Sequence, residues 1–228
     1  MIPKLSKRLR CIASLVAPYR YVIDIGTDHA LVPIYLSKKG LITHAIASDV
    51  NTGPLDEAIK NIKHYNLEAQ ITIKKGNGLE VISDYDKCDV IIIAGMGGKL
   101  ITDILAKGKA KLKTNKRLIL QPNVAESEIR LWLKSNNYQI TNEVIVKEDS
   151  KFYEIIVSEK SDNVNYTDEE IKFGPVLLQI KTKYFIEKWT EILNLRINTY
   201  LKIPHNHPNK IDFQKEINQI KTVLKDVH

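Results

Sequence analysis

The first 160 residues alternate between short apolar runs and amphipathic stretches, and this alternation restricts the fold more than any other feature of the sequence. The run from Asp89 to Ala94 is nearly continuously apolar, which is typical of a parallel strand covered on both faces. Each such run precedes a stretch with loop or helical spacing, which predicts a doubly wound α/β sheet with right-handed crossovers. The expected strands occupy residues 21–25, 45–49, 71–73, 89–94 and 118–120.

Two more strand-like runs, 138–147 and 152–158, are joined by a short polar connection that favours an antiparallel hairpin. The composition changes near Ser161, after which apolar residues recur at three- and four-residue intervals on both sides of a turn at 204–208. From Phe213 to Val227 these residues form a heptad seam. We therefore expect one domain over residues 1–160 and an antiparallel, coiled-coil-like helical hairpin over residues 161–228.

The chain carries 34 basic and 27 acidic residues, a formal charge of +7. Residues 1–160 hold a charge of +6 and the remainder only +1. One basic cluster lies within residues 99–117, and a second comprises Lys4, Lys7, Arg8 and Arg10. Excess positive charge attracts polyanions such as nucleic acids, whereas a solvated lysine face is the alternative for either cluster taken alone.

Other features exclude whole classes of protein. No apolar run approaches the ~20 residues that span a bilayer, and the N-terminus lacks the apolar segment of a secretion signal. Cys11 and Cys88 are isolated thiols, which favours a reducing compartment and excludes a Cys-rich zinc site. His205 and His207 have no further residue with ligand spacing near them. We therefore expect a cytoplasmic monomer with neither membrane nor metal.

The loop from Asp24 to Ala30, after the first expected strand, is the strongest candidate ligand site. Gly26 permits a tight turn, but the further glycines of a dinucleotide-binding loop are missing, which disfavours a pyrophosphate. The loop therefore suits a ligand without phosphates, such as S-adenosylmethionine, with Asp24 beside its amino acid portion. Asp49 ends the second strand, where a carboxylate can accept hydrogen bonds from ribose hydroxyls. If the Asp24–Ala30 loop is considered alone, the alternative is an ordinary strand–turn–helix connection that binds no ligand.

Glycine-rich loops also follow the third and fourth expected strands. Asn77 is placed to hydrogen-bond an adenine edge, and the glycines after Ala94 allow either a close ligand or a tight strand–helix junction. Ligands of doubly wound folds bind at the carboxyl ends of the strands, so these loops together predict a single site. The candidate cofactor-binding residues are Asp24, Gly26, Thr27, Asp49, Val50, Gly76, Asn77, Gly78, Ala94, Gly95, Met96 and Gly97.

Three polar residues are candidates for chemistry. Asp28 and His29 adjoin in the first loop, where they can orient a substrate base or move protons. Asn123 closes the fifth strand after Gln121-Pro122 and can offer amide contacts to a base.

These motifs together resemble the bacterial tRNA (adenine-N1)-methyltransferases that act on nucleotide 22. The resemblance implies a class I methyltransferase domain, a Rossmann-like sheet of strand order 3-2-1-4-5-7-6, with a C-terminal helical hairpin. Asn77 departs from the aspartate expected there. The segments that carry the resemblance are Leu5-Ser6-Lys7-Arg8-Leu9, the Asp24–Ala30 loop, Gly78-Leu79-Glu80-Val81, Ala94-Gly95-Met96-Gly97-Gly98, Leu120-Gln121-Pro122-Asn123 and Phe173-Gly174-Pro175.

The resemblance further implies transfer of a methyl group from S-adenosylmethionine to N1 of a tRNA adenine, with S-adenosylhomocysteine as product. Neutral N1 carries a lone pair, so alignment matters more than a strong base. The product is cationic, and we assign its stabilisation to Asp28, with His29 and Asn123 as positioning groups. The base has to leave its stack, and the expected phosphate contacts are Lys4, Lys7, Arg8 and Arg10.

Other functions stay open at this point. A methyltransferase acting on a small molecule or a protein would keep the four loops without needing the basic clusters. A non-enzymatic RNA-binding module with a degenerate pocket and a nicotinamide dehydrogenase are further alternatives, the latter weakened by the missing glycines.

Overall fold

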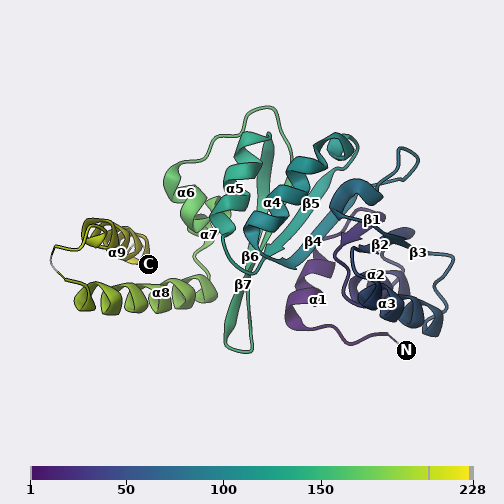
Figure 1. Ribbon diagram of the computed structural model, residues 1–228, viewed down its shortest axis with the longest axis horizontal. Helices are drawn as coiled ribbons and strands as arrows, with labels where there is room; N and C mark the ends of the chain where they lie inside the picture. The colour runs from purple at the N-terminus through teal and green to yellow at the C-terminus, as the bar shows by residue number, and fades with distance from the viewer. Residues whose placement is uncertain (1, 205, 226–228) are drawn as a thin grey trace. The chain divides into compact units, whose positions relative to one another are not determined.

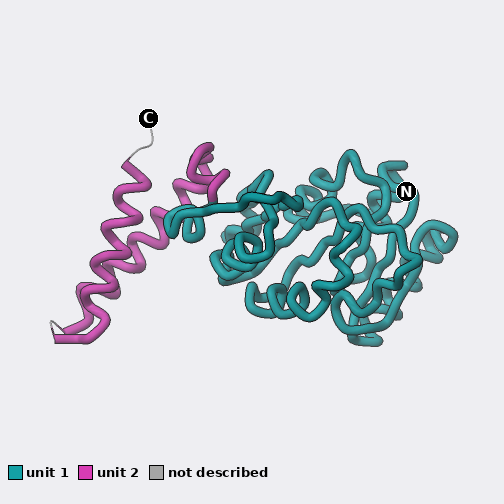
Figure 2. Tube along the Cα trace, turned by 90° about the horizontal axis from the view of Figure 1, so that it is seen from above, with its two compact units in different colours: residues 1–174 teal, residues 175–228 magenta. Residues whose placement is uncertain are grey.

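The computed structural model describes residues 2–204 and 206–225 (Figure 1). Contacts divide the chain into two compact units, residues 1–174 and residues 175–228 (Figure 2). This division lies beyond the boundary expected after residue 160, because helix α6 (Asp168–Phe173) packs against α5 (Glu126–Ser135) of the first unit. None of the helices within the described ranges is both long and apolar enough to cross a membrane.

A seven-stranded sheet forms the centre of the first unit, and its order β3-β2-β1-β4-β5-β7-β6 confirms the predicted topology. Strands β1 to β5 pair in parallel, β7 pairs antiparallel with β5, and β6 pairs antiparallel with β7. The strands are β1 (Tyr21–Ile25), β2 (His44–Asp49), β3 (Ile71–Lys75), β4 (Val90–Met96), β5 (Arg117–Pro122), β6 (Tyr138–Glu148) and β7 (Lys151–Lys160).

Alternation along β4 produces a core on both faces of the sheet. Val90 and Ile92 belong to one apolar cluster with residues of α1, α2 and α3, whereas Ile91 and Ile93 point to the opposite face. All four side chains are fully buried, and α4 and α5 lie over the strands β4 to β6 (Figure 1). The remaining elements of the unit are α1 (Lys7–Ser14), α2 (Leu31–Lys38), α3 (Thr52–His64), α4 (Gly98–Lys107) and the 3-10 helices η1 (Gly78–Val81) and η2 (Lys109–Lys113).

Helix α1 is an element that the sequence pattern does not predict. It is only eight residues long, and a helix this short needs help from its surroundings. The Ser6 hydroxyl accepts a hydrogen bond from the Leu9 amide. Glu148, at the end of β6, accepts one from the Lys7 amide at 2.6 Å. The strand hairpin therefore caps α1 and holds it beside the sheet.

The strand register brings the ends of the parallel strands to one edge. Ile25 pairs with Ser48, and Asp49 with Lys75, so β1, β2 and β3 end together. On the other side of β1, β4 and β5 pair to their last residues with an irregularity between Ala94 and Met96. The loops that the sequence singles out therefore meet at the carboxyl edge of the sheet.

The second unit contains α7 (Pro175–Ile180), α8 (Lys183–Lys202) and α9 (Lys210–Lys225). Helices α8 and α9 pack on each other as the predicted hairpin, and an ion pair of 2.8 Å joins Arg196 to Glu216. On α9 the buried residues are Ile217, Ile220 and Val223, while Leu224 of the expected seam is only half-buried. Val227 of that seam and His205 of the turn lie outside the described residues.

The guanidinium of Arg130 is completely buried and joins three parts of the first unit. It donates to Glu143 on β6 at 2.8 Å, to Glu154 on β7, and to two backbone carbonyls at the end of α6. Burial favours the neutral form, but the two carboxylates outweigh it and raise the pKa of Arg130. Gly174 lies against this ion cluster and has a φ of +94°. A Cβ at this position would lie 2.6 Å from a Glu143 oxygen.

We predict that Arg130→Met lowers the free energy of unfolding by about 3–5 kcal/mol, because it leaves two buried carboxylates without their cation. Urea denaturation of the full chain measures this change. The matched control is Lys99→Met, which removes an exposed pair with Asp103 and should hardly move the unfolding midpoint. Equal midpoints for the two variants would contradict the structural role of Arg130.

Candidate functional site

Two adjoining cavities lie at the carboxyl edge of the sheet in the first unit. The first cavity, of about 290 Å³, lies between α1 and the ends of β1 and β4. The second, of about 210 Å³, lies over the ends of β2 and β3. Both are lined by Gly26, Asp49 and Met96. The two cavities therefore follow one another along the edge where four of the predicted loops converge.

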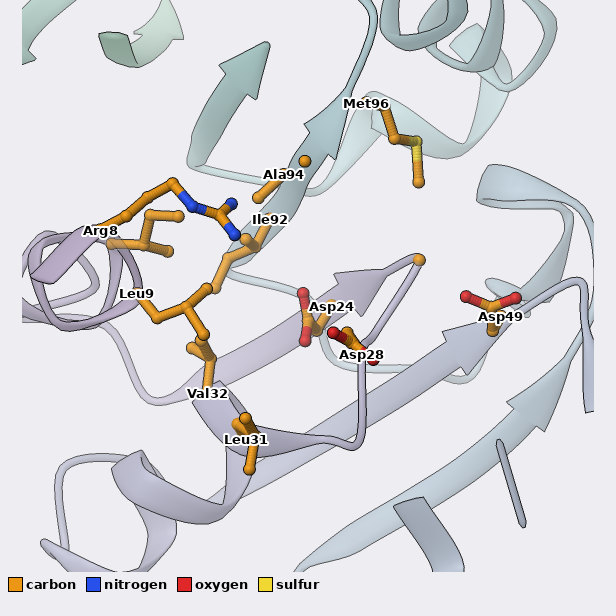
Figure 3. Close-up of a pocket in the computed structure, with 13 residues that line it drawn as sticks. Arg8, Leu9, Asp24, Asp28, Leu31, Val32, Asp49, Ile92, Ala94 and Met96 are labelled. Atoms are coloured by element: carbon orange, nitrogen blue, oxygen red, sulfur yellow. The ribbon is translucent and has the colours of Figure 1, made fainter. Parts of the chain in front are cut away.

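Gly26 forms the floor between the two cavities. The amides of Gly26 and Thr27 both donate to the Ser48 carbonyl at 2.8 Å, which turns the chain sharply after β1. Gly26 has a φ of +72°, and a Cβ there would lie 2.1 Å from the terminal methyl of Met96. Met96 points from the end of β4 toward this turn (Figure 3). Only glycine combines this backbone conformation with so close an approach.

Asp24 places a buried carboxyl group at the wall of the first cavity. The Thr27 hydroxyl donates to it at 2.6 Å. Burial raises the pKa of Asp24 to about 6, the Thr27 hydrogen bond opposes this shift, and the neighbouring charges of Asp28 and Asp49 add to it. Near neutral pH the carboxylate is therefore ionised yet poorly solvated, a state that attracts a cationic ligand group.

Asp28 and Asp49 add two carboxylates to the same cavity. Asp28 is 81% exposed, and one of its oxygens lies 3.0 Å from Nε2 of His29. Asp49 borders both cavities, and its Oδ1 accepts the Asn51 amide at 2.7 Å, which orients the carboxylate at the end of β2. Figure 3 shows Asp24 and Asp28 close together and Asp49 beyond the turn.

The second cavity has apolar walls and a polar rim. Ile25, Val50, Leu100 and Ile104 supply the walls, and Asn77 stands exposed at the rim. Apolar surfaces close to a few polar groups are typical of pockets for flat heterocycles. Gly76 and Gly78 line the same cavity, so every predicted residue of the loop after β3 is at the site.

Hydrogen bonds with two side-chain amides hold the C-terminal end of β4. The Gly95 amide donates to Gln121 Oε1 at 3.2 Å, and Asn123 Nδ2 donates to the Gly95 carbonyl at 2.7 Å. Gln121 Nε2 in turn donates to the Pro122 carbonyl at 2.6 Å and to Asn123 Oδ1 at 3.4 Å. The Asn123 side chain is therefore engaged with the backbone of the protein. Gln121, fully buried at the end of β5, supports the site; in the sequence it belongs to the Leu120–Asn123 segment that carries the family resemblance, but it is not one of the candidate site residues.

Four of the predicted cofactor-binding and catalytic residues line neither cavity, whereas Arg8, which the sequence predicts as a phosphate contact, lines the first one. Within the described ranges, Thr27, His29, Gly97 and Asn123 do not line either cavity. Lys4, Lys7 and Arg10 are exposed, whereas Arg8 lines the first cavity. Arg8 points from α1 toward β4 (Figure 3). No cluster of three His, Cys, Asp or Glu residues that could hold a metal occurs in the part of the chain that the structure describes.

The basic cluster within residues 99–117 lies mostly away from the cavities. Lys111 and Lys116 precede β5, at the amino edge of the sheet. Lys111 pairs with Asp84 at 3.2 Å and Lys116 with Asp89 at 2.9 Å. Lys111 and Lys116 are therefore neutralised by carboxylates at the edge opposite the site.

Comparison with known proteins identifies the family. Residues 22–223 match the family model for tRNA (adenine(22)-N(1))-methyltransferase. The enzyme of that name from Bacillus subtilis (strain 168) is 37% identical over 98% of this chain and 97% of its own. The crystal structure of Streptococcus pneumoniae Sp1610, described as a putative tRNA (m1A22) methyltransferase in complex with S-adenosyl-L-methionine, is 37% identical. It covers 97% of this chain and all of its own with a TM-score of 0.91.

The structure of M. capricolum TrmK in complex with S-adenosyl-homocysteine is 30% identical, with a TM-score of 0.89. It covers 98% of this chain and 99% of its own length. These similarities extend over both units and over all the loops that form the cavities. The chain therefore belongs to the tRNA (adenine(22)-N(1))-methyltransferase family.

Proposed function

We propose that the first unit binds S-adenosylmethionine along the carboxyl edge of its sheet and directs the methyl group to N1 of adenine 22 in a tRNA. The observation that carries this proposal is the pair of adjoining cavities that share Gly26, Asp49 and Met96. Relatives of 37% and 30% identity have been solved with S-adenosylmethionine and S-adenosylhomocysteine, which supports the same cofactor and product here.

The residues present fit this cofactor. Its ammonium and sulfonium groups are cationic, and the first cavity offers the buried carboxylate of Asp24 with Asp28 and Asp49 nearby. The turn at Gly26 lacks a side chain where the ligand has to pass. The apolar walls of the second cavity suit an adenine ring, and Asn77 at its rim supplies a polar contact.

When bound, the cofactor supplies a methyl group on a positively charged sulfur, which neutral adenine N1 attacks without help from a base. The protein holds the two reactants in line. Asp28, at the cavity wall, stabilises the positive charge that develops on the adenine. His29 lies 3.0 Å from Asp28 and restrains its orientation. Asn123 positions the Gly95 backbone instead of touching the base.

The tRNA is held by charges outside the cavity. Lys4, Lys7 and Arg10 are exposed around α1, which borders the first cavity, and they contact backbone phosphates. Residues 175–228 contain nine Lys and Arg against five Asp and Glu, a formal charge of +4. The acidic residues 162–170, which make the stretch from 161 nearly neutral, belong to the first unit. The α8–α9 hairpin therefore contacts a second part of the tRNA.

We further infer that the protein acts as a cytoplasmic monomer. Cys11 and Cys88 are both free thiols, which fits a reducing compartment. The cavities are lined by residues of a single chain, so a partner subunit is not required to complete them.

The direct test is methyl transfer from labelled S-adenosylmethionine to unmodified tRNA transcripts, followed by mapping of the modified nucleotide. We expect methylation at N1 of adenine 22 and none on a transcript with guanine at that position. Bound cofactor without transfer to any tRNA would contradict the proposed substrate while leaving the cofactor site intact.

We predict that cofactor affinity depends on pH through Asp24. The carboxylate attracts the cationic ligand and the neutral acid does not, so affinity is full above about pH 7. Because the pKa of Asp24 is about 6 in the free protein, affinity falls by up to about tenfold per pH unit below that value. Calorimetric titration between pH 5 and pH 7.5 measures the effect. Asp24→Asn should bind weakly at every pH; an unchanged pH dependence in this variant would exclude Asp24 as the cause.

We predict that Asp28→Asn lowers kcat for tRNA methylation on the order of 10–100-fold, because the variant lacks the charge that stabilises the cationic product. The dissociation constant for the cofactor should change little, since Asp24 and Asp49 remain. Asp84→Asn is the matched control, because Asp84 is 91% exposed and lies at the opposite edge of the sheet. Equal losses of cofactor affinity and kcat in Asp28→Asn would instead assign Asp28 to the cofactor.

A further inference from the structure

Arg8 is the one member of its basic cluster that faces the sheet. Leu5 and Ile12 are buried, and Leu9 packs against the same core. Within the helix, positions 8, 9 and 12 share one face, so Arg8 lies on the inward side of α1. Lys7 and Arg10 fall on the exposed side. Because Glu148 and Ser6 cap the start of α1, this orientation is set by the fold.

The contacts of Arg8 are made to the protein itself. Its Nη1 donates to Gln121 Oε1 at 2.5 Å, and its guanidinium carbon lies 5.3 Å from the centre of the Tyr153 ring on β7. A Cβ on Gly95 would lie 3.6 Å from the same Nη1. Arg8 therefore connects α1, β5 and β7 beside the loop after β4.

One property of arginine makes this contact reinforce the orientation of the Gln121 amide behind it. A guanidinium can only donate hydrogen bonds, so Gln121 has to turn its oxygen toward Arg8. The Gln121 nitrogen then donates to the Pro122 carbonyl at 2.6 Å and, more weakly, to Asn123 Oδ1 at 3.4 Å. This leaves Asn123 Nδ2 to donate to the Gly95 carbonyl. Together with the Gly95 amide and the Pro122 carbonyl, Arg8 therefore holds the orientation of the Gln121 amide, and through it that of Asn123.

We propose that Arg8 is a positioning residue for methyl transfer, which acts through Gln121 and Asn123 on the backbone at Gly95, and not a phosphate contact. The proposal rests on the proposed function, because it places the target adenine beside the loop that Arg8 holds. Gly95 has a φ of +79°, which glycine adopts without strain, so the hydrogen bonds of its amide and carbonyl hold this peptide in place. Loss of Arg8 removes the charged donor from Gln121 Oε1, leaves this amide to the Gly95 amide and the Pro122 carbonyl, and so loosens this wall of the first cavity.

The kinetic test compares Arg8→Ala with Lys7→Ala in the full chain. Arg8→Ala should lower kcat tenfold or more, and the salt dependence of tRNA binding should stay that of the wild type. Lys7→Ala should instead raise the KM for tRNA and reduce the slope of log K against log [salt] by about 1, the effect of one lost phosphate contact. A reduced slope with unchanged kcat in Arg8→Ala would overturn the proposal.

A double-mutant cycle tests whether Arg8 acts through Gln121. In a Gln121→Ala background, Arg8→Ala should cost little further kcat; fully additive losses would overturn the proposed connection. Arg8→Lys should recover part of the kcat, because one ammonium can still donate to Gln121. Recovery is incomplete because lysine lacks the planar group that stacks over Tyr153.

Hydrogen exchange at the Gly95 amide provides a readout that needs neither tRNA nor cofactor. Gly95 is exposed, so its bond to Gln121 is the source of its protection. We expect faster exchange at Gly95 in Arg8→Ala and wild-type exchange in Lys7→Ala. Unchanged exchange in Arg8→Ala would overturn the proposal. Failure of the wild type to methylate tRNA would contradict the proposed function, and the exchange result would still decide what Arg8 holds.

Discussion

Parallel strands that are buried on both faces carry few polar side chains except near their ends. The middle of β4 is entirely apolar, and its neighbours β1 and β5 carry their buried polar residues, Asp24 and Gln121, next to their last positions. Parallel pairing then brings these ends together. The cavities, the carboxylates and the glycine turns all follow from this single constraint.

A buried charged side chain has different roles at two places in the first unit. Asp24 is buried without a cation beside it, so its pKa rises to about 6 and the site is prepared for a cationic ligand. Arg130 is also buried, but two glutamates surround it. Its charge is satisfied internally, and it serves to hold α6 against the sheet. The difference between a ligand site and a structural ion cluster is therefore whether the partner charge belongs to the protein.

Helix α1 connects the strand hairpin to the site. Glu148 holds the start of α1, and hydrogen bonds from the α1 amides keep the pKa of Glu148 low although burial opposes this. From this position α1 extends Arg8 over Tyr153 to Gln121. The antiparallel pair β6–β7 thus supports the cofactor cavity from a distance, through one short helix.

The sequence by itself determined the order of the strands, the loops that form the site and most of the residues that line it. Apolar periodicity and glycine turns are local signals, and Asp24, Gly26, Asp49 and Asn77 were found because each lies at or shortly beyond the C-terminal end of a predicted strand. Only the tertiary structure decided what Arg8 and Gln121 do and where the second unit begins. A basic residue in a short helix looks the same in sequence whether it faces solvent or a cavity. Its direction depends on Glu148, 140 positions further along the chain, and such long-range contacts leave no periodic trace.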